Sequence, residues 1–242
     1  IAPDSRHRLT AALVHVLESG SARGHCAIPS ELLIEETRKI VQLPEVGTDE
    51  VAIRNALSEA TTDKSVIEET HDGVPHIFLP SLHRAECGVA EEIQRLMPGR
   101  PNWPEIDIPK AIDWVQQQTG MALSSSQAAA VQMVLQNKVS IVTGGPGVGK
   151  TSTTKSLLLI TTAKKVRVAL CAPTGRAAKR LSDATGMPAM TIHRLLEFDP
   201  RARRFLRNKD NPIEADFILC DEYSMLDIRL ARALLRATPT KA

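Results

Sequence analysis

VSIVTGGPGVGKT, residues 139–151, joins an apolar run to a glycine-rich loop that ends in Gly-Lys-Thr. From Gly144 to Thr151 the sequence matches G-x-x-x-x-G-K-[S/T] at every fixed position. The apolar run predicts a strand, and residues 150–162 predict a helix. Strand, loop and helix in this order are the context that the pattern requires, so this stretch predicts an α/β unit.

The residue types in this loop predict phosphate binding. Glycines let backbone N–H groups turn inward around phosphate oxygens, and the following helix adds the positive end of its dipole. Lys150 is expected to reach the β- and γ-phosphates of ATP, and the Thr151 hydroxyl to ligate Mg²⁺. The predicted nucleotide contacts of the loop are Gly144, Gly145, Pro146, Gly147, Val148, Gly149, Lys150, Thr151 and Ser152. The alternative is a loop without a ligand, which the complete motif in its context disfavours.

Two further apolar runs, VRVALCAP at 166–173 and ADFILCDE at 215–222, also predict strands. Each is followed by a predicted helix, at 176–184 and 227–237. Apolar strands that alternate with helices predict a parallel sheet with helices on both faces. The fold expected for this part of the chain is therefore a P-loop α/β domain.

Asp221 and Glu222 end the last of these runs. Asp221 is expected to hold Mg²⁺, and Glu222 to orient and deprotonate an attacking water. An acidic pair after an apolar run is weak evidence alone, and the glycine-rich loop about seventy residues upstream strengthens it. Lys150, Asp221 and Glu222 are thus the predicted catalytic residues, and Thr151 and Asp221 the predicted metal ligands.

Gln127 opens a predicted amphipathic helix within LSSSQAAAVQMVL, residues 123–135. A glutamine amide both donates and accepts, so it can pair with the N6 and N7 edge of adenine. A glutamine that only caps the helix is the alternative, and the residue by itself favours that reading.

The first 97 residues follow another pattern. Three predicted helices precede two β-rich runs that flank Asp72-Gly73, a strong hairpin signal, and a helix closes the unit. This is the order of a winged helix, and a small α+β domain of another kind is an equal alternative. PGRPNWPEIDIP, residues 98–109, has four prolines and predicts a stiff linker. The expected domains are 1–97 and 110–242.

Charge is distributed unevenly between these parts. Residues 1–97 carry nine Lys/Arg against sixteen Asp/Glu, a net charge of −7, whereas residues 164–209 carry twelve against three, a net charge of +9. Only the second segment is typical of a surface that meets a polyanion.

Other features exclude some classes of protein. No apolar run is long enough to span a membrane, and the first residues do not resemble a signal peptide. Four scattered cysteines without a CxxC pair predict buried thiols in a cytoplasmic protein. His83 and Cys87 share a possible helix face, but without ligand spacing on both sides a zinc site is disfavoured. Because the chain lacks an initiator Met, we expect it to start inside a longer protein.

Five segments together resemble the superfamily 1 DNA helicases, and the RecD-like branch most of all. They are LSSSQAAAVQMVL, IVTGGPGVGKT, CAPTGRAAKRL, TIHRLL and LCDEYSML, in this order. GHCAIP and LHRAECGVAEEIQRL, further upstream, resemble the region before the motor in free-standing members. The resemblance implies a RecA-like motor domain that uses ATP and Mg²⁺ and moves 5′→3′ on DNA. It also implies other subunits of a recombination or repair complex as possible partners.

The resemblance assigns single-stranded DNA contacts to two short segments. These contacts are Pro173, Thr174, Gly175 and Arg176 in the first segment, and Thr191, His193 and Arg194 in the second. The residues of the first segment are suited to this role, because N–H groups at the start of the helix after residue 173 can hold a DNA phosphate. Arg176, Lys179 and Arg180 recur on one helix face, where a solvated basic face is the alternative.

The resemblance also sets an expectation about completeness. Family members continue past the acidic pair with a γ-phosphate sensor and a second RecA-like domain, so we expect an incomplete sheet and a nearly inactive fragment. Tyr223 replaces a residue that is often small in the family. Two other interpretations stay open, which are a nucleotide-gated DNA-binding regulator without translocation and a structural remnant.

Overall fold

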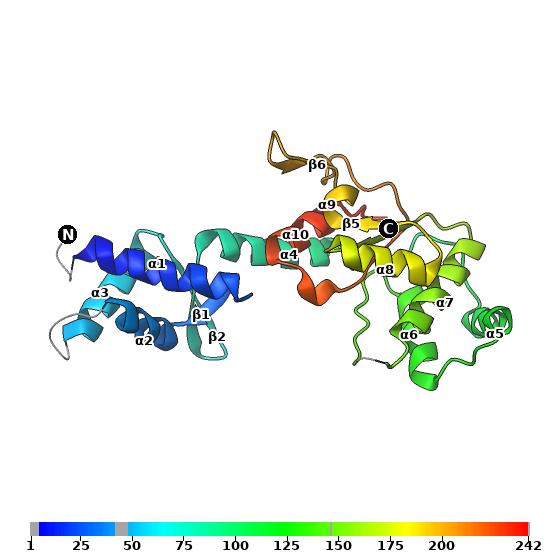
Figure 1. The fold of residues 1–242 in the computed structure, drawn as a ribbon, viewed down its shortest axis with the longest axis horizontal. Helices are drawn as coiled ribbons and strands as arrows, with labels where there is room; N and C mark the ends of the chain where they lie inside the picture. The colour runs from blue at the N-terminus through cyan, green and yellow to red at the C-terminus, as the bar shows by residue number, and fades with distance from the viewer. Residues whose placement is uncertain (1–4, 42–47, 146, 242) are drawn as a thin grey trace. The chain divides into compact units, whose positions relative to one another are not determined.

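The computed structural model describes residues 5–41, 48–145 and 147–241 (Figure 1). The chain forms two compact units. Unit 1 consists of residues 1–88 with 227–229, and unit 2 of residues 89–226 with 230–242. The division falls within α4 (Pro80–Leu96), and the proline-rich segment 98–109 lies inside unit 2. Domain boundaries at that segment stay a prediction. None of the helices in the described ranges combines the length and apolar character that crossing a membrane would need.

Unit 1 packs three helices against a small antiparallel sheet. The helices are α1 (Arg6–Ala22), α2 (Ser30–Val41) and α3 (Thr48–Thr62), and the strands are β1 (Ala27–Pro29), β2 (Ile67–His71) and β3 (Val74–Phe78), in sheet order β1-β3-β2. Leu13, Leu33, Ile53 and Ile77 are fully buried in its core. The Asp72-Gly73 hairpin is confirmed. Both residues have positive φ, 50° and 78°, which gives the tight turn that joins β2 to β3.

Unit 2 contains a three-stranded parallel sheet in the order β5-β4-β8. Its elements are α5 (Ile108–Thr119), α6 (Ser125–Gln136), α7 (Lys150–Ala163), β4 (Val168–Ala172), α8 (Gly175–Thr185), β5 (Ala189–Thr191), α9 (Ile192–Leu195), the hairpin strands β6 (Phe198–Asp199) and β7 (Arg204–Phe205), β8 (Phe217–Cys220), the 3-10 turn η1 (Tyr223–Met225) and α10 (Ile228–Ala237). Strands β4 and β8, each followed by a helix, confirm two of the three predicted strand–helix pairs.

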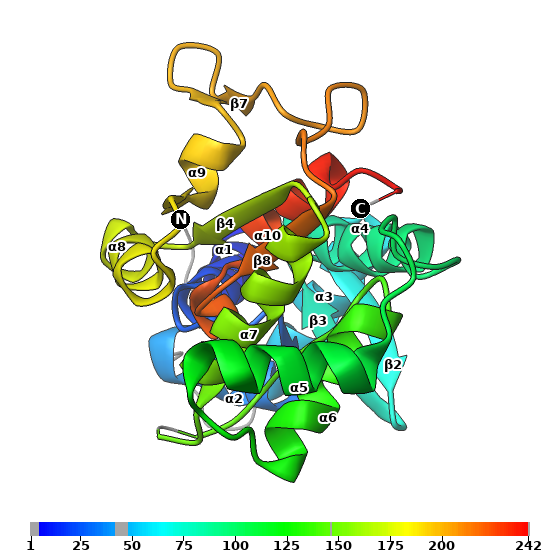
Figure 2. The same cartoon turned by 90° about the vertical axis from the view of Figure 1, so that its right-hand side faces the viewer.

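The sheet of unit 2 is covered on both faces. Leu170 points into a cluster with Leu158 of α7 and Leu181 of α8. Its neighbour Cys171 points the other way, into a cluster with α9 and Leu234 of α10. This is the alternation expected of a buried strand. Helices α5, α6 and α7 form a third cluster together with Phe217, and Figure 2 shows them gathered on one side of β4 and β8.

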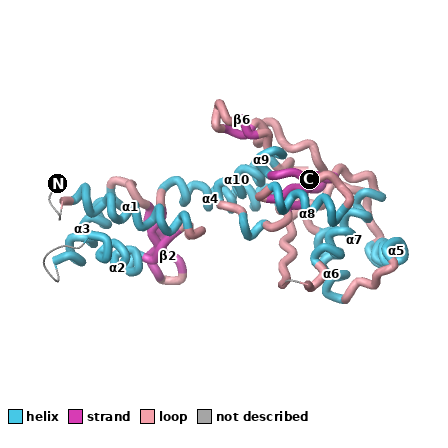
Figure 3. Tube along the Cα trace, viewed as in Figure 1, coloured by secondary structure: helices cyan, strands magenta, loops and turns pink. Residues whose placement is uncertain are grey.

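The strand predicted at residues 139–144 is absent from this sheet. The described residues 139–145 form no strand, and Figure 3 draws the run before α7 as loop. Ile141 is 78% exposed, and Val142 is 39% exposed. An apolar sequence gives only a tendency to form a strand, and the strand itself exists only where hydrogen bonds to a sheet edge are made. The described sheet makes none to this run, so that part of the prediction is wrong for this structure.

Candidate functional site

The glycine-rich loop curls around the side chain of Lys150. Gly147 and Gly149 have φ of 80° and 84°, and α7 begins at Lys150 itself. The Lys150 ammonium donates to the carbonyl oxygen of Gly145 at 2.8 Å and also to that of Gly144. Thr151 is exposed in the first turn of the helix, and Ser152 is half-buried. Pro146, a predicted contact, lies outside the described residues.

Gln127 both caps α6 and holds the loop. Its Oε1 accepts from the Ser124 N–H at 2.9 Å, while the Ser124 hydroxyl accepts from the Gln127 N–H at 3.3 Å, which completes a capping box. Its Nε2 donates to the Val148 carbonyl at 3.2 Å. The capping interpretation therefore has direct support, and the contact with adenine stays a prediction. The hydrogen bond from Gln127 to the loop was not predicted, because sequence spacing alone does not show which carbonyl oxygen the amide reaches.

Parallel pairing brings three of the predicted segments to the same side of the sheet, the side at which its strands have their carboxyl ends. This side is called the sheet edge below. Ala172 of β4 lies opposite Thr191 of β5, and Cys171 lies opposite Cys220 of β8. The N–H of Asp221 donates to the Cys171 carbonyl at 2.9 Å. Since parallel strands end at the same edge, the segments 173–176, 191–194 and 221–222 leave the sheet side by side. Ligands of open α/β sheets bind at this kind of edge.

The two threonines of the predicted DNA segments are helix caps. Thr174 accepts from the Ala177 N–H at 3.2 Å at the start of α8, and Thr191 accepts from the Arg194 N–H at 3.3 Å at the start of α9. These bonds fix the two helix starts, whose free N–H groups then point outward. Pro173 precedes the first cap and is half-buried, while Gly175 follows it and is exposed.

Basic side chains stand on the exposed side of both helices. Arg176, Lys179 and Arg180 of α8 and Arg194 of α9 are all exposed. They make no ion pair with any residue that the structure describes. His193 is different, because its ring packs against Phe198 and Phe205 at 5.7 and 5.6 Å between centroids. This aromatic cluster ties α9 to the β6–β7 hairpin, and no spacing in the sequence pointed to it.

The acidic pair follows β8, as predicted, at a point where the backbone bends sharply. Glu222 has a φ of 53° and is exposed, and Asp221 is half-buried. Within the described part of the chain, no hydrogen bond or ion pair joins either carboxylate to Lys150 or Thr151. A hydrogen bond with Cys220 and burial together raise the pKa of the Cys171 thiol. Burial also raises the pKa of Tyr223, beside the acidic pair.

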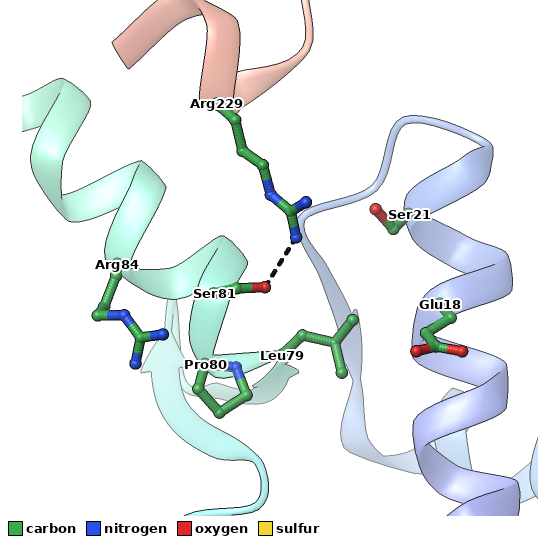
Figure 4. Close-up of a pocket in the computed structure, with 7 residues that line it drawn as sticks. All are labelled: Glu18, Ser21, Leu79, Pro80, Ser81, Arg84 and Arg229. Atoms are coloured by element: carbon green, nitrogen blue, oxygen red, sulfur yellow. Dashed lines mark hydrogen bonds between the residues drawn. The ribbon is translucent and has the colours of Figure 1, made fainter. Parts of the chain in front are cut away.

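Unit 1 has a shallow hollow that contains none of the predicted site residues. Figure 4 shows its lining, where Arg229 donates to the Ser81 hydroxyl at 2.8 Å. The lining residues are Glu18, Ser21, Leu79, Pro80, Ser81, Arg84 and Arg229. The candidate functional site is therefore the loop and the sheet edge of unit 2.

A glycine-rich loop that opens a helix packed on a parallel sheet, with acidic residues after a neighbouring strand, defines the P-loop class of nucleotide-binding domains. The family model described as AAA domain matches residues 127–242. The ATP-dependent RecD2 DNA helicase of Deinococcus radiodurans is 33% identical over 245 residues, which covers 99% of this chain and 33% of that protein. The RecBCD enzyme subunit RecD of Mycolicibacterium smegmatis is 30% identical over 185 residues, 66% of this chain and 32% of that protein.

A more distant similarity joins the chain to the ATP-dependent DNA helicase dda of Enterobacteria phage T4, 33% identical over 129 residues, 48% of this chain and 29% of that protein. The chain belongs to the RecD-like helicase family. It spans about a third of the length of the relatives just named.

Proposed function

We propose that this chain is the ATP-binding and first DNA-contacting part of a DNA helicase that moves 5′→3′. The observation that carries the proposal is the sheet edge, where parallel pairing gathers two capped, basic helix starts and an acidic pair. Family membership supports the direction of movement. We further propose that the protein works in the cytoplasm, on single-stranded DNA, alone or with other subunits of a recombination or repair complex.

Nucleotide binding is assigned to the glycine-rich loop. The ammonium of Lys150 donates to two loop carbonyls, and these are the bonds that phosphate oxygens would replace. Helix α7 directs its first N–H groups and the positive end of its dipole toward the same place. Mg²⁺ would be held by the exposed Thr151 hydroxyl and by Asp221, and it would neutralise charge on the transferred phosphate. Glu222, exposed beside Asp221, would orient the attacking water.

DNA binding is assigned to the starts of α8 and α9. The caps made by Thr174 and Thr191 leave helix-start N–H groups free for phosphates. Arg176 and Arg194 stand beside them, exposed and without an ion pair among the described residues. Phosphate oxygens of the DNA backbone would accept hydrogen bonds from both the N–H groups and the guanidinium groups.

We propose a different role for unit 1, which is to contact protein and not DNA. Its helix and strand order is compatible with a winged helix, a fold often used to bind duplex DNA. However, residues 1–97, which include residues 1–88 of unit 1, carry a net charge of −7, and the hairpin presents Glu68, Glu69 and Asp72. The one basic residue of α3, Arg54, is held by Glu31 at 2.6 Å and Glu50 at 2.8 Å. Unit 1 therefore offers little positive charge to release counterions from DNA.

A titration with fluorescent ATP or ADP tests the nucleotide site. We expect Lys150→Ala to weaken binding about a hundredfold, because it removes charged hydrogen bonds to two phosphates. Lys155→Ala is the matched control, since this lysine is exposed on the same helix beyond the loop. Equal affinity of both variants and the unchanged chain would refute the assignment.

Fluorescence anisotropy with single-stranded DNA tests the sheet edge. Arg176→Ala and Arg194→Ala should each weaken binding about tenfold, the size of one charged contact. Lys164→Ala is the control, because it removes the same charge just before β4, at the other end of the strand. If the control weakened binding as much as the two arginine variants, general charge and not this edge would account for the affinity.

A further inference from the structure

Three side chains of unit 1 bring potential metal ligands together. Glu69 lies on β2, and His83 and Cys87 lie one turn apart on α4. Their ligand atoms all lie within 4.8 Å of one another. His83 is bound to Glu69, with Nε2 to Oε1 at 2.8 Å, and the Cys87 sulfur lies 3.8 Å from the same Nε2. A carboxylate, an imidazole and a thiolate thus converge from two elements that are separate in the sequence.

The spacing of these atoms suits a small tetrahedral ion. With zinc–nitrogen and zinc–sulfur bonds of about 2.1 and 2.3 Å, two ligands of a tetrahedron stand about 3.6 Å apart. The observed 3.8 Å between the sulfur and Nε2 is close to that value. The 2.8 Å between Nε2 and the carboxylate is shorter than the corresponding edge of about 3.4 Å. A small rotation of the exposed Glu69 side chain would lengthen this distance.

His83 is held in place before any ion binds. Its ring makes an edge contact with Phe78, with centroids 5.3 Å apart, and its side chain is only 20% exposed. Glu69 and Cys87 are exposed, so an ion has an open approach. The sulfur is almost equally far from both ring nitrogens, 3.8 and 3.9 Å, so it lies beside the ring and not in front of Nε2. A rotation of the exposed Cys87 side chain would bring the sulfur to an ion held by Nε2.

We propose that Glu69, His83 and Cys87 form a binding site for a thiolate-seeking divalent ion, Zn²⁺ above all, with water as the fourth ligand. Sulfur and imidazole ligands select zinc and disfavour magnesium, so this site is chemically distinct from the one proposed beside Asp221. A bound ion would tie the middle of β2 to α4 and stabilise unit 1. The site stands independently of the proposed function.

Cobalt substitution in the full chain tests this site. We expect the chain to bind one Co²⁺ with a thiolate-to-cobalt absorption band that excess Zn²⁺ abolishes and excess Mg²⁺ does not. Cys87→Ser should remove the band, and His83→Gln and Glu69→Gln should weaken Zn²⁺ binding at least tenfold in a competition with a chromogenic chelator. His25→Gln and Cys26→Ser are the controls, because they alter the other His–Cys pair of unit 1.

A second measurement needs no variant and so does not depend on folding. Zn²⁺ should slow alkylation of Cys87 in the unchanged chain, as read by mass spectrometry of the peptide, while Mg²⁺ leaves the rate unchanged. The proposal is overturned if Cys87 reacts equally fast with and without Zn²⁺, or if the cobalt band survives Cys87→Ser. Either result would mean that the three side chains form only a hydrogen-bonded pair beside a free thiol.

Discussion

Gly149 has little conformational freedom in the glycine-rich loop. Its φ of 84° is unfavourable for any residue with a Cβ. A Cβ there would also lie 2.0 Å from Nε2 of Gln127, the atom that holds the loop to α6. Glycine is thus required at this position both by the backbone and by the neighbouring amide.

We predict that Gly149→Ala lowers the free energy of unfolding of unit 2 by about 1–2 kcal/mol, the cost of the left-handed conformation, and displaces Gln127. Gly145→Ala is the control, since its Cβ would meet no atom within 4 Å and its φ is not positive. Urea unfolding followed by tryptophan fluorescence measures the difference, because Trp103 and Trp114 both lie in unit 2. Equal stability of the two variants would contradict the steric argument.

At the scale of elements, one ion pair joins the starts of two adjacent strands. Arg167, just before β4, donates to both carboxylate oxygens of Asp216, just before β8, at 2.8 Å each. The Asp216 side chain is 14% exposed, and its hydrogen bonds with Arg167 lower the pKa of its carboxyl group. Because the folded pKa lies below the unfolded one, the stabilisation is present above the unfolded value and is lost as pH falls through the folded value.

We therefore predict that Asp216→Asn lowers the Tm by a few degrees at neutral pH, and that the difference shrinks as the solution is acidified below about pH 4. Asp210→Asn, which alters an exposed carboxylate in the loop before β8, should leave the Tm unchanged at both pH values. Thermal unfolding followed by circular dichroism across this pH range is the measurement. A constant difference between Asp216→Asn and the unchanged chain would show that the ion pair is not its source.

At the scale of the whole molecule, charge is distributed unevenly along the chain, and we expect this distribution to determine where DNA binds. Residues 164–209 carry a net charge of +9, while residues 1–97 carry −7. Affinity for a polyanion comes mainly from the release of counterions, so it should depend on the basic segment alone and fall steeply with salt.

Replacing both Lys179 and Arg180 by Gln should reduce the slope of log affinity against log salt by about 0.7 for each phosphate that these side chains neutralise. Replacing Lys64 and Arg84 by Gln, which removes the same charge from unit 1, should leave the slope unchanged. Anisotropy titrations at several salt concentrations give both slopes. A smaller slope in the second pair would assign DNA binding to unit 1 and contradict the role proposed for it.

The sequence by itself determined the features that are local in the chain. The Asp72-Gly73 turn, the P-loop pattern and the alternation of strands and helices in unit 2 each depend on a few neighbouring residues. The positions of β4 and β8 were predicted because each is a short, continuous apolar run, and in the structure both strands contact apolar clusters on the two faces of the sheet. Local propensity and hydrophobic periodicity suffice for such features.

Only the tertiary structure decided what depends on partners far away in the chain. The apolar run at 139–144 has the sequence of a strand, yet it makes no hydrogen bonds with the described sheet. A strand forms only where the backbone can pair with a neighbouring strand, and the sequence does not determine that. Gln127 holds the loop, and His193 packs on Phe198, through side chains that no spacing rule brings together. The meeting of Glu69 with His83 and Cys87 depends in the same way on how the hairpin packs near α4, because contacts between distant segments follow from packing and not from local sequence.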